Sequence, residues 1–235
     1  MALERELKYS SPEGTVPALA DILAVLRPLG AGATELGATT HVDVYFDDAR
    51  RAVQRAGLAL RVRTTGARRV ATLKGRGSVV DGVHERDELE VTLPPEPAAA
   101  TGGEAPQSTG GAPAEWPSEF GAHLPGVELR ALTPRMIITT ERHRFTIVQD
   151  GAPVAELAFD EVACQPAAEA ALSYLVDEVL FHEVELEALS AGGRPPVSAE
   201  ALARYGAALQ ELLPLYPSDI TKLERAATLL AAFEE

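Results

Sequence analysis

Several segments of this sequence alternate with the two-residue period of a β-strand, and within each segment the charges on one face share a sign. In a strand, residues i and i+2 project from the same face, about 7 Å apart. Carboxylates or arginines recur in this way at Glu4 and Glu6; Glu88 and Glu90; Glu183, Glu185 and Glu187; Arg61 and Arg63; and Arg142 and Arg144. The opposite faces are mostly apolar. The fold must therefore gather like charges along one surface of each strand.

A half-exposed antiparallel sheet explains the alternation in any single segment. It does not explain the separation of signs, because solvated faces usually mix charges of both signs. Separate acidic and basic strands make physical sense around a cavity that holds divalent cations together with a polyanion. Carboxylates suit Mg²⁺ or Mn²⁺, and arginine forks bind phosphate. We therefore predict a closed barrel with a polar interior, whose apolar faces turn outward under helices.

The strand patterns continue on both sides of a Pro/Gly/Ala-rich segment at 94–126, so we predict a single domain over 1–235 with a flexible insertion. Strands are predicted at 3–9, 41–47, 58–64, 68–74, 84–93, 136–148, 153–162 and 179–189. A Gly-rich loop is predicted at 75–82. Helices are predicted at 16–29, 198–213 and 219–233, with Thr15, Ser198 and Ser218 as N-caps. The C-terminal helices, within 198–235, are expected to pack on the barrel.

Composition excludes several classes of function. A net charge of −14 argues against nonspecific nucleic-acid binding, which relies on neutralising many phosphates. No apolar run approaches the length of a membrane span. The single cysteine, Cys164, excludes an internal disulfide framework and a thiolate metal cluster. The N-terminus shows no secretory signal, so a cytoplasmic location is expected.

Nine short elements occur in an order that resembles the CYTH superfamily, the triphosphate tunnel metalloenzymes that include thiamine triphosphatase and the class IV adenylate cyclases. They are the ExExK pattern of Glu4, Glu6 and Lys8, VDVYFDD at 42–48, GLALRVR at 57–63, TLK at 72–74, RDELE at 86–90, TERHRF at 140–145, LAFDEV at 157–162, HEVELE at 182–187 and SDITKLERA at 218–226. The resemblance covers nearly the whole chain outside the insertion. It implies an α+β fold with an eight-stranded antiparallel β-barrel tunnel, a polar lumen and flanking helices.

The resemblance also implies roles for the charged residues. The expected metal ligands are Glu4, Glu6, Glu183 and Glu185, with Asp160 as a further candidate. Glu88, Glu90 and Glu187 have two interpretations, as metal ligands or as counter-charges to neighbouring arginines. The expected phosphate-binding residues are Lys8, Arg61, Arg63, Lys74, Arg86, Arg142 and Arg144, with Lys222 closing one end of the tunnel. Lys222 has an alternative interpretation as a solvent-facing lysine of a terminal helix. The catalytic set is Glu4, Glu6, Lys8, Glu183 and Glu185.

The implied function is hydrolysis of a phosphoanhydride bond with Mg²⁺ or Mn²⁺. Inorganic triphosphate is favoured over thiamine triphosphate or a nucleoside triphosphate, because the only tryptophan, Trp116, lies in the insertion and no ring-binding pocket is evident. Two alternatives stay open: a class IV-type adenylate cyclase that makes cyclic AMP, and a noncatalytic polyphosphate or nucleotide-binding module. The ending ITKLERAATLL resembles the point at which some members continue into a CHAD domain, and homo-oligomerisation also stays open.

Overall fold

A computed structural model gives the structure of the protein. It describes residues 2–12, 14–80, 83–95, 112–113, 115–124, 126–167, 178–189 and 197–231, with the backbone alone at 2–4, 76, 79 and 80.

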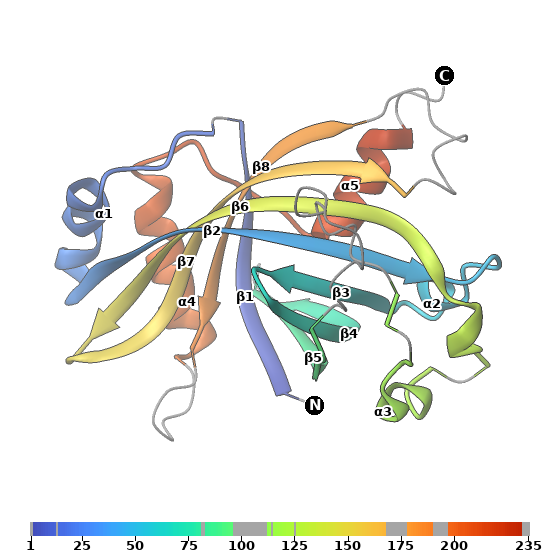
Figure 1. Ribbon diagram of the computed structural model, residues 1–235. Helices are drawn as coiled ribbons and strands as arrows, with labels where there is room; N and C mark the ends of the chain where they lie inside the picture. Colours follow the sequence, from blue (N-terminus) through green and yellow to red (C-terminus); the bar gives the residue numbers. More distant parts are fainter. Residues whose placement is uncertain are drawn as a thin grey trace.

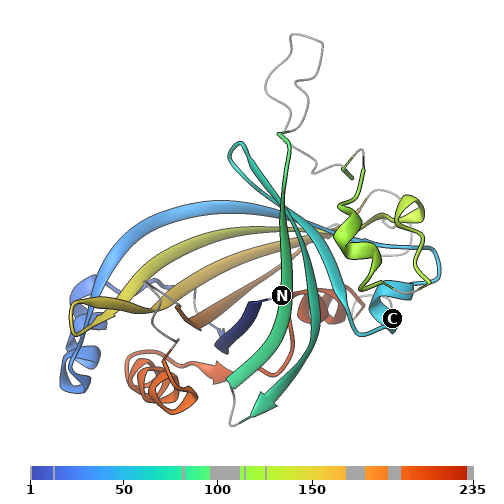
Figure 2. The ribbon, with the colours of Figure 1, turned by 90° about the horizontal axis from the view of Figure 1, so that it is seen from below.

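Eight long antiparallel strands close into a ring (Figure 1). They are β1 (Ala2–Ser11), β2 (Ala31–Asp47), β3 (Ala59–Thr65), β4 (Arg68–Val80), β5 (Val83–Leu93), β6 (Thr133–Gln149), β7 (Ala152–Pro166) and β8 (Val179–Ala188). Their order is β5-β4-β3-β2-β6-β7-β8-β1, and pairing of β5 with β1 completes the ring. Figure 2 shows how strongly the sheet curves. The predicted eight-stranded tunnel is therefore confirmed.

Two helices cover the outer face of one half of the ring. The helices α1 (Leu19–Leu26) and α4 (Ala199–Gln210) lie together at one end of the sheet (Figure 1). A short 3₁₀ helix, η1 (Arg27–Leu29), follows α1. Leu202 of α4 joins a buried cluster with outward-facing residues of β1, β6 and β8, including Leu7, Phe145 and Leu186. The main apolar core therefore lies outside the ring, as the alternating pattern predicted.

The outer face of β2, β3 and β4 is covered by the chain that precedes β6. Phe120 in α3 (Ser118–Gly121) and Leu124 are fully or almost fully buried against Val44 and Leu60. Trp116 packs edge-on against Phe46, with 5.0 Å between ring centroids. These residues belong to the segment predicted as a flexible insertion, and they pack because their aromatic and leucine side chains bury apolar area. Residues 96–111 of that segment lie outside the described residues.

The helix α5 (Lys222–Ala231) packs against the lumen side of the ring. Its Ala226 and Leu230 contact Ile138 of β6 and Cys164 of β7, which share strand faces with Arg142 and Asp160. One end of the lumen is therefore apolar and filled by α5, whereas the rest is charged. Smaller elements are α2 (Ala52–Arg55), η2 (Leu129–Ala131) and β9 (Tyr216–Pro217), which pairs with β1. None of the described helices has the length and apolar character needed to cross a membrane.

Local differences from the sequence-based prediction concern element ends. β4 continues through most of the predicted 75–82 loop to Val80, because β5 supplies pairing partners along this stretch. β2 begins ten residues before the predicted strand at 41, paired along its whole length with β6. The predicted cap Thr15 is wrong, since α1 has Ala18 at its N-cap, whereas Ser198 caps α4 as predicted by accepting from Ala201 N.

Candidate active site

The lumen contains a cavity of about 230 Å³ lined by charged side chains from six strands and α5. Its cationic lining residues are Lys8, Arg61, Arg63, Lys74, Arg86, Arg142 and Lys222, and its acidic ones are Glu6, Glu88, Glu90, Glu185 and Glu187. Because side chains alternate along a strand, most of the residues whose charges share a strand face in the sequence reach this single space; Glu183 and Arg144 do not line it. The lining carries more positive than negative side chains within a protein whose net charge is −14. The cavity is therefore suited to an anion.

One wall is built from arginines of β3. Register places Asp43 of β2 opposite Arg63, and the Asp43 carboxylate accepts two hydrogen bonds of 2.7 Å from Arg63 Nε and Nη2. Arg61 Nη1 donates to the same carboxylate at 3.3 Å. Burial opposes ionisation of Asp43, but the two guanidinium groups outweigh it and hold the pKa of Asp43 well below its usual range. The anionic Asp43 thus fixes both arginines toward the lumen.

A second wall joins β1 to β5 and β4. Glu6 Oε1 lies 3.1 Å from Lys8 Nζ and accepts from Arg86 Nη2 at 2.6 Å. Across the neighbouring strands, Lys74 Nζ lies 3.1 Å from Glu88 Oε1. Glu6 and Glu88 therefore each face a cation.

The acidic cluster at the β7–β8 side consists of Asp160, Glu183 and Glu185, and the ammonium group of Lys222 lies among them. Lys222 Nζ donates to Asp160 Oδ2 at 2.7 Å and to Glu185 Oε1 at 3.2 Å. Arg142 donates to both oxygens of Asp160, at 2.8 and 2.6 Å, and also to Glu185. Lys222 is buried, which decides between its two sequence-based interpretations: it faces the tunnel and not solvent.

These contacts set the protonation of the cluster. Burial alone would lower the pKa of Lys222, but Asp160, Glu185 and Glu183 raise it above its usual range, so the ammonium stays charged. Burial alone would raise the pKa of Glu185, but Lys222 and Arg142 hold it well below its usual range. Glu183 differs, because burial raises its pKa despite Lys222 at 3.6 Å and Arg225 at 3.7 Å. Neither oxygen of Glu183 has a hydrogen-bond partner among the described residues.

Backbone contacts and a helix cap position Lys222. Ser218 N donates to Lys8 O at 2.9 Å, and His84 Nε2 donates to Ser218 O at 2.9 Å. Glu224 N then donates to Thr221 Oγ1 while Thr221 N donates to Glu224 Oε2, which forms a capping box. The predicted cap Ser218 is therefore wrong. A capping box needs a glutamate three residues after the cap, and Glu224 has that position relative to Thr221. Lys222 is the first residue of α5, at the lumen.

The remaining predicted site residues lie at different depths. Asp160 and Glu183 are buried behind Lys222 and do not line the cavity itself. Arg144 lies outside the cavity, 3.6 Å from Glu156. The side chain of Glu4 lies outside the described residues, although its backbone pairs with Arg86.

Sequence reasoning missed three contributors: Asp43, Tyr45 and Thr221. The VDVYFD alternation already placed Asp43 and Tyr45 on one face, but only the register of β2 against β3 shows that this face turns inward.

Among the described side chains, no three His, Cys, Asp or Glu groups converge to hold a metal ion by themselves. Mg²⁺ in phosphate-binding sites typically uses one or two carboxylates together with substrate phosphates and water. Carboxylate oxygens facing the cavity and the unpartnered oxygens of Glu183 have the donor chemistry for such an ion. The residues present therefore fit a divalent cation that binds together with an anionic ligand.

Comparison with known proteins gives a consistent result. The family model described as the CYTH domain matches residues 2–226. HpAC1 from Hippeastrum, described as a candidate adenylyl cyclase with a dominant triphosphatase activity, is 18% identical with a TM-score of 0.55, over 96% of this chain and 95% of that one. A candidate adenylate cyclase from Bacillus halodurans is also 18% identical, with a TM-score of 0.52, over 96% and 98% of the two chains. No curated protein sequence matches the chain.

Proposed function

Because the chain belongs to the CYTH domain family, we propose that it hydrolyses a phosphoanhydride bond in inorganic triphosphate or in a triphosphorylated organic molecule, with Mg²⁺ or Mn²⁺. The observation that carries this proposal is the single cavity into which seven cationic side chains and five carboxylates point. The triphosphatase activity described for HpAC1, which has the same fold, supports it.

The cationic residues perform the work that phosphoryl transfer requires of a protein. Charge on the transferring phosphoryl and its leaving group must be stabilised while the reacting atoms are held in line. Arg61 and Arg63 are held in place by Asp43, so they need little reorganisation to bind phosphate oxygens. Lys222 supplies a permanent positive charge and not a base, since its pKa is raised. We assign Lys8, Lys74, Arg86 and Arg142 to the remaining phosphate oxygens.

The carboxylates are the proposed metal-binding residues. Glu4, Glu6, Glu183 and Glu185 would hold the divalent cation, with Asp160 behind them. A bound divalent cation supplies charge neutralisation of the phosphate chain. We assign Glu88, 3.1 Å from Lys74, to the role of counter-charge. Glu90 accepts from Thr72 Oγ1 at 3.3 Å. We propose that a carboxylate of the acidic cluster orients the attacking water.

A cyclase is the second candidate, favoured by the adenylyl cyclase descriptions of both structural relatives. In that reaction the 3′ hydroxyl of ATP attacks its own α-phosphate and pyrophosphate leaves. The cavity provides the same charge stabilisation for either reaction, so the products decide. A noncatalytic binding module would bind the same anions without any turnover.

The test is to incubate the purified protein with inorganic triphosphate, ATP or thiamine triphosphate in the presence of Mg²⁺, Mn²⁺ or EDTA and to identify the products. We expect orthophosphate release that requires the metal. Glu6→Gln and Glu4→Gln should each abolish release, whereas Glu161→Gln, an exposed residue next to Asp160, should not. Cyclic AMP with pyrophosphate would establish the cyclase, and binding without metal-dependent turnover would establish the noncatalytic module.

A further inference from the structure

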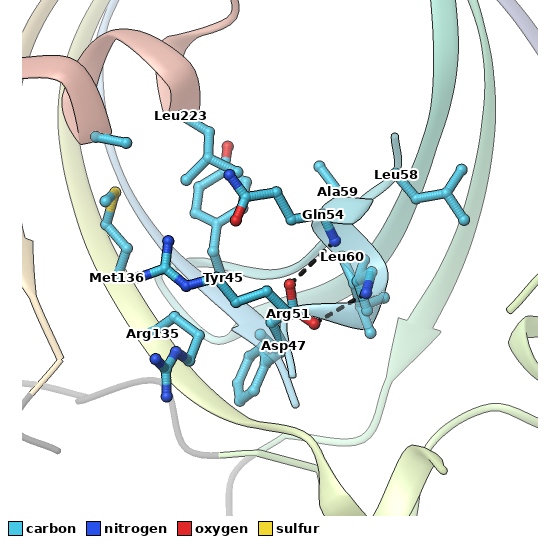
Figure 3. A pocket seen from close by; sticks show the side chains of 13 residues that line it. Tyr45, Asp47, Arg51, Gln54, Leu58, Ala59, Leu60, Arg135, Met136 and Leu223 are labelled. Carbon is cyan, nitrogen blue, oxygen red and sulfur yellow. Dashed lines mark hydrogen bonds between the residues drawn. The ribbon is translucent and has the colours of Figure 1, made fainter. Parts of the chain in front are cut away.

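His41 of β2 faces the inside of the ring, next to the cationic residues of the tunnel. Side chains alternate along β2, so His41 shares the inward strand face with Asp43 and Tyr45. Tyr45 lines both the tunnel cavity and a smaller pocket beside it, together with Leu223 of α5 (Figure 3). The His41 side chain is only partly buried. An ionisable imidazole therefore lies at the tunnel beside the residues that line the cavity.

One ring nitrogen of His41 is anchored and the other has no partner. Nδ1 lies 2.7 Å from Oγ1 of Thr65, the last residue of β3. Nε2 makes no hydrogen bond within the described part of the chain. On the other flank, Thr140 of β6 pairs with His41, and its buried Oγ1 has no hydrogen-bond partner among the described residues. Buried polar groups are normally hydrogen-bonded, so this part of the ring has hydrogen-bonding capacity left for a ligand or water.

Two cations and two carboxylates act on His41 from the strands around it. The cations are Arg63 on β3 and Arg142 on β6, and the carboxylates are Asp43 on β2 and Asp160 on β7. Burial, followed by the two arginines, lowers the pKa of His41 to about 4, and the carboxylates offset this only in part. The imidazole is therefore neutral at pH 7.

A bound phosphate chain changes the charge around the imidazole. Arg63 and Arg142 both line the tunnel cavity, and the proposed function assigns both to phosphate oxygens. Phosphates bound to these arginines offset the repulsion that keeps His41 neutral, and negative charge near an imidazole favours its protonated form. We expect the pKa of His41 to rise in the complex to about 6.5 or above, the range of an ordinary histidine.

Resting on the proposed function, we propose that His41 is a further cationic residue of the anion site, which becomes charged by taking up one proton from solvent only when a triphosphate chain occupies the tunnel. The imidazolium donates from both ring nitrogens, from Nδ1 to Thr65 Oγ1 and from Nε2 toward the bound anion. No bond of the substrate breaks in this step. The anion therefore binds together with a proton, and its affinity rises as the pH falls from 8 to 6.

Histidine NMR measures the charge of His41 directly. The wild-type protein, isotope-labelled at histidine, is titrated with pH alone and again with Mg²⁺ and a saturating methylene-bridged analogue of triphosphate. The signals that disappear in His41→Gln belong to His41. We expect the pKa of His41 to be about 4 without the analogue and about 6.5 or above with it. His143, on the outer face of β6 with a side chain 37% exposed, should titrate at the same pH in both conditions.

Calorimetric titration with the same analogue, in buffers of different ionisation enthalpy, measures proton uptake. For a pKa that rises from about 4 to about 6.5, the wild type should take up about three quarters of a proton more than His41→Gln at pH 6. Its affinity should increase between pH 8 and pH 6 by about fourfold more than that of His41→Gln. The titration of the analogue itself is common to all the proteins and cancels in the difference. His143→Gln is the matched control and should behave as the wild type.

Neither measurement needs turnover, so failure of this inference and failure of the proposed function are separable. A His41 pKa that stays near 4 with the analogue bound, or equal proton uptake by the wild type and His41→Gln, would overturn the inference and leave the proposed function standing. If the wild type binds the analogue with the expected proton uptake but releases no orthophosphate from any triphosphate, the proposed hydrolysis alone is wrong. Absence of any binding of the analogue would count against both.

Discussion

Replacement of Lys222 by methionine removes the positive charge at the centre of the acidic cluster while keeping the length of the side chain. Lys222 Nζ bonds to Asp160 at 2.7 Å and to Glu185 at 3.2 Å, and all three residues are shielded from water. Removal of one partner of a buried ion pair costs about 3–5 kcal/mol, because the cluster then keeps its buried negative charge with Arg142 alone donating to Asp160 and Glu185. For a chain of this size each kcal/mol lowers Tm by about 2–4 °C, which gives a fall of about 6–20 °C.

The assay is urea unfolding followed by the fluorescence of Trp116, which packs against Phe46 and Phe120. The control is Arg130→Met, whose exposed ion pair with Glu128 predicts a change of no more than about 0.5 kcal/mol. Saturating Mg²⁺ should raise the free energy of unfolding of Lys222→Met more than that of the wild type, because the divalent cation then offsets the negative charge of the acidic cluster. A cation that binds only the folded state adds about 2.7 kcal/mol at one hundred times its dissociation constant.

The reasoning is refuted if the free energy of unfolding of Lys222→Met lies within about 1 kcal/mol of the wild-type value. That result would mean that the ammonium lies in water and that the carboxylates are not gathered around it. Equal stabilisation of both proteins by Mg²⁺ would instead contradict the assignment of this cluster as the place where the cation binds.

Two further predictions concern the surroundings of the tunnel. Asp43→Asn should lower the free energy of unfolding by about 3 kcal/mol at pH 7, because two guanidinium groups lose the Asp43 carboxylate. Since the folded-state pKa of Asp43 is lowered, this stabilisation is present above the unfolded-state pKa and should shrink below about pH 4. Urea unfolding should therefore give a larger cost at pH 7 than at pH 3, and equal costs would count against the prediction. Phe120→Ala should lower the free energy of unfolding by about 3–5 kcal/mol in the same assay without changing kcat/KM, because Phe120 is fully buried on the outer face of the ring. A cost under about 1 kcal/mol would show that residues 116–124 do not pack there.

The sequence alone predicted which side of each strand faces the lumen, because the strand pattern has a period of two residues and the charges on one side share a sign. Arg61, Arg142 and Glu185 reach one cavity for that reason, and the apolar residues Val62, Phe145 and Leu186 turn outward. The alternating patterns alone predicted eight strands, and the family resemblance agreed with that number. It also placed Lys222 at the tunnel, a position that helical pattern alone would have assigned to solvent.

The first half of β2 was missed because AGATELGATT has no apolar alternation. Its pairing with β6 supplies the order, with a bulge between Glu35 and Gly37 where φ of Gly37 is +82°. Likewise, nothing local marks Asp43 as the partner of Arg63, because that contact depends on the register of two strands. The pocket lined by Arg51, Arg135 and Leu223 was missed for the same reason, since these residues meet only in the folded chain.

The most direct test of the central claim is a crystal structure of the protein with Mn²⁺ and a nonhydrolysable triphosphate analogue, with the metal located by anomalous scattering. We expect the phosphates against Arg61, Arg63 and Arg142 inside the ring, and the anomalous peak between those phosphates and the carboxylates of Glu6 and Glu185. Phosphates bound on the outer surface, or a metal peak away from the lumen, would contradict the claim that the inward-facing charges form the catalytic site.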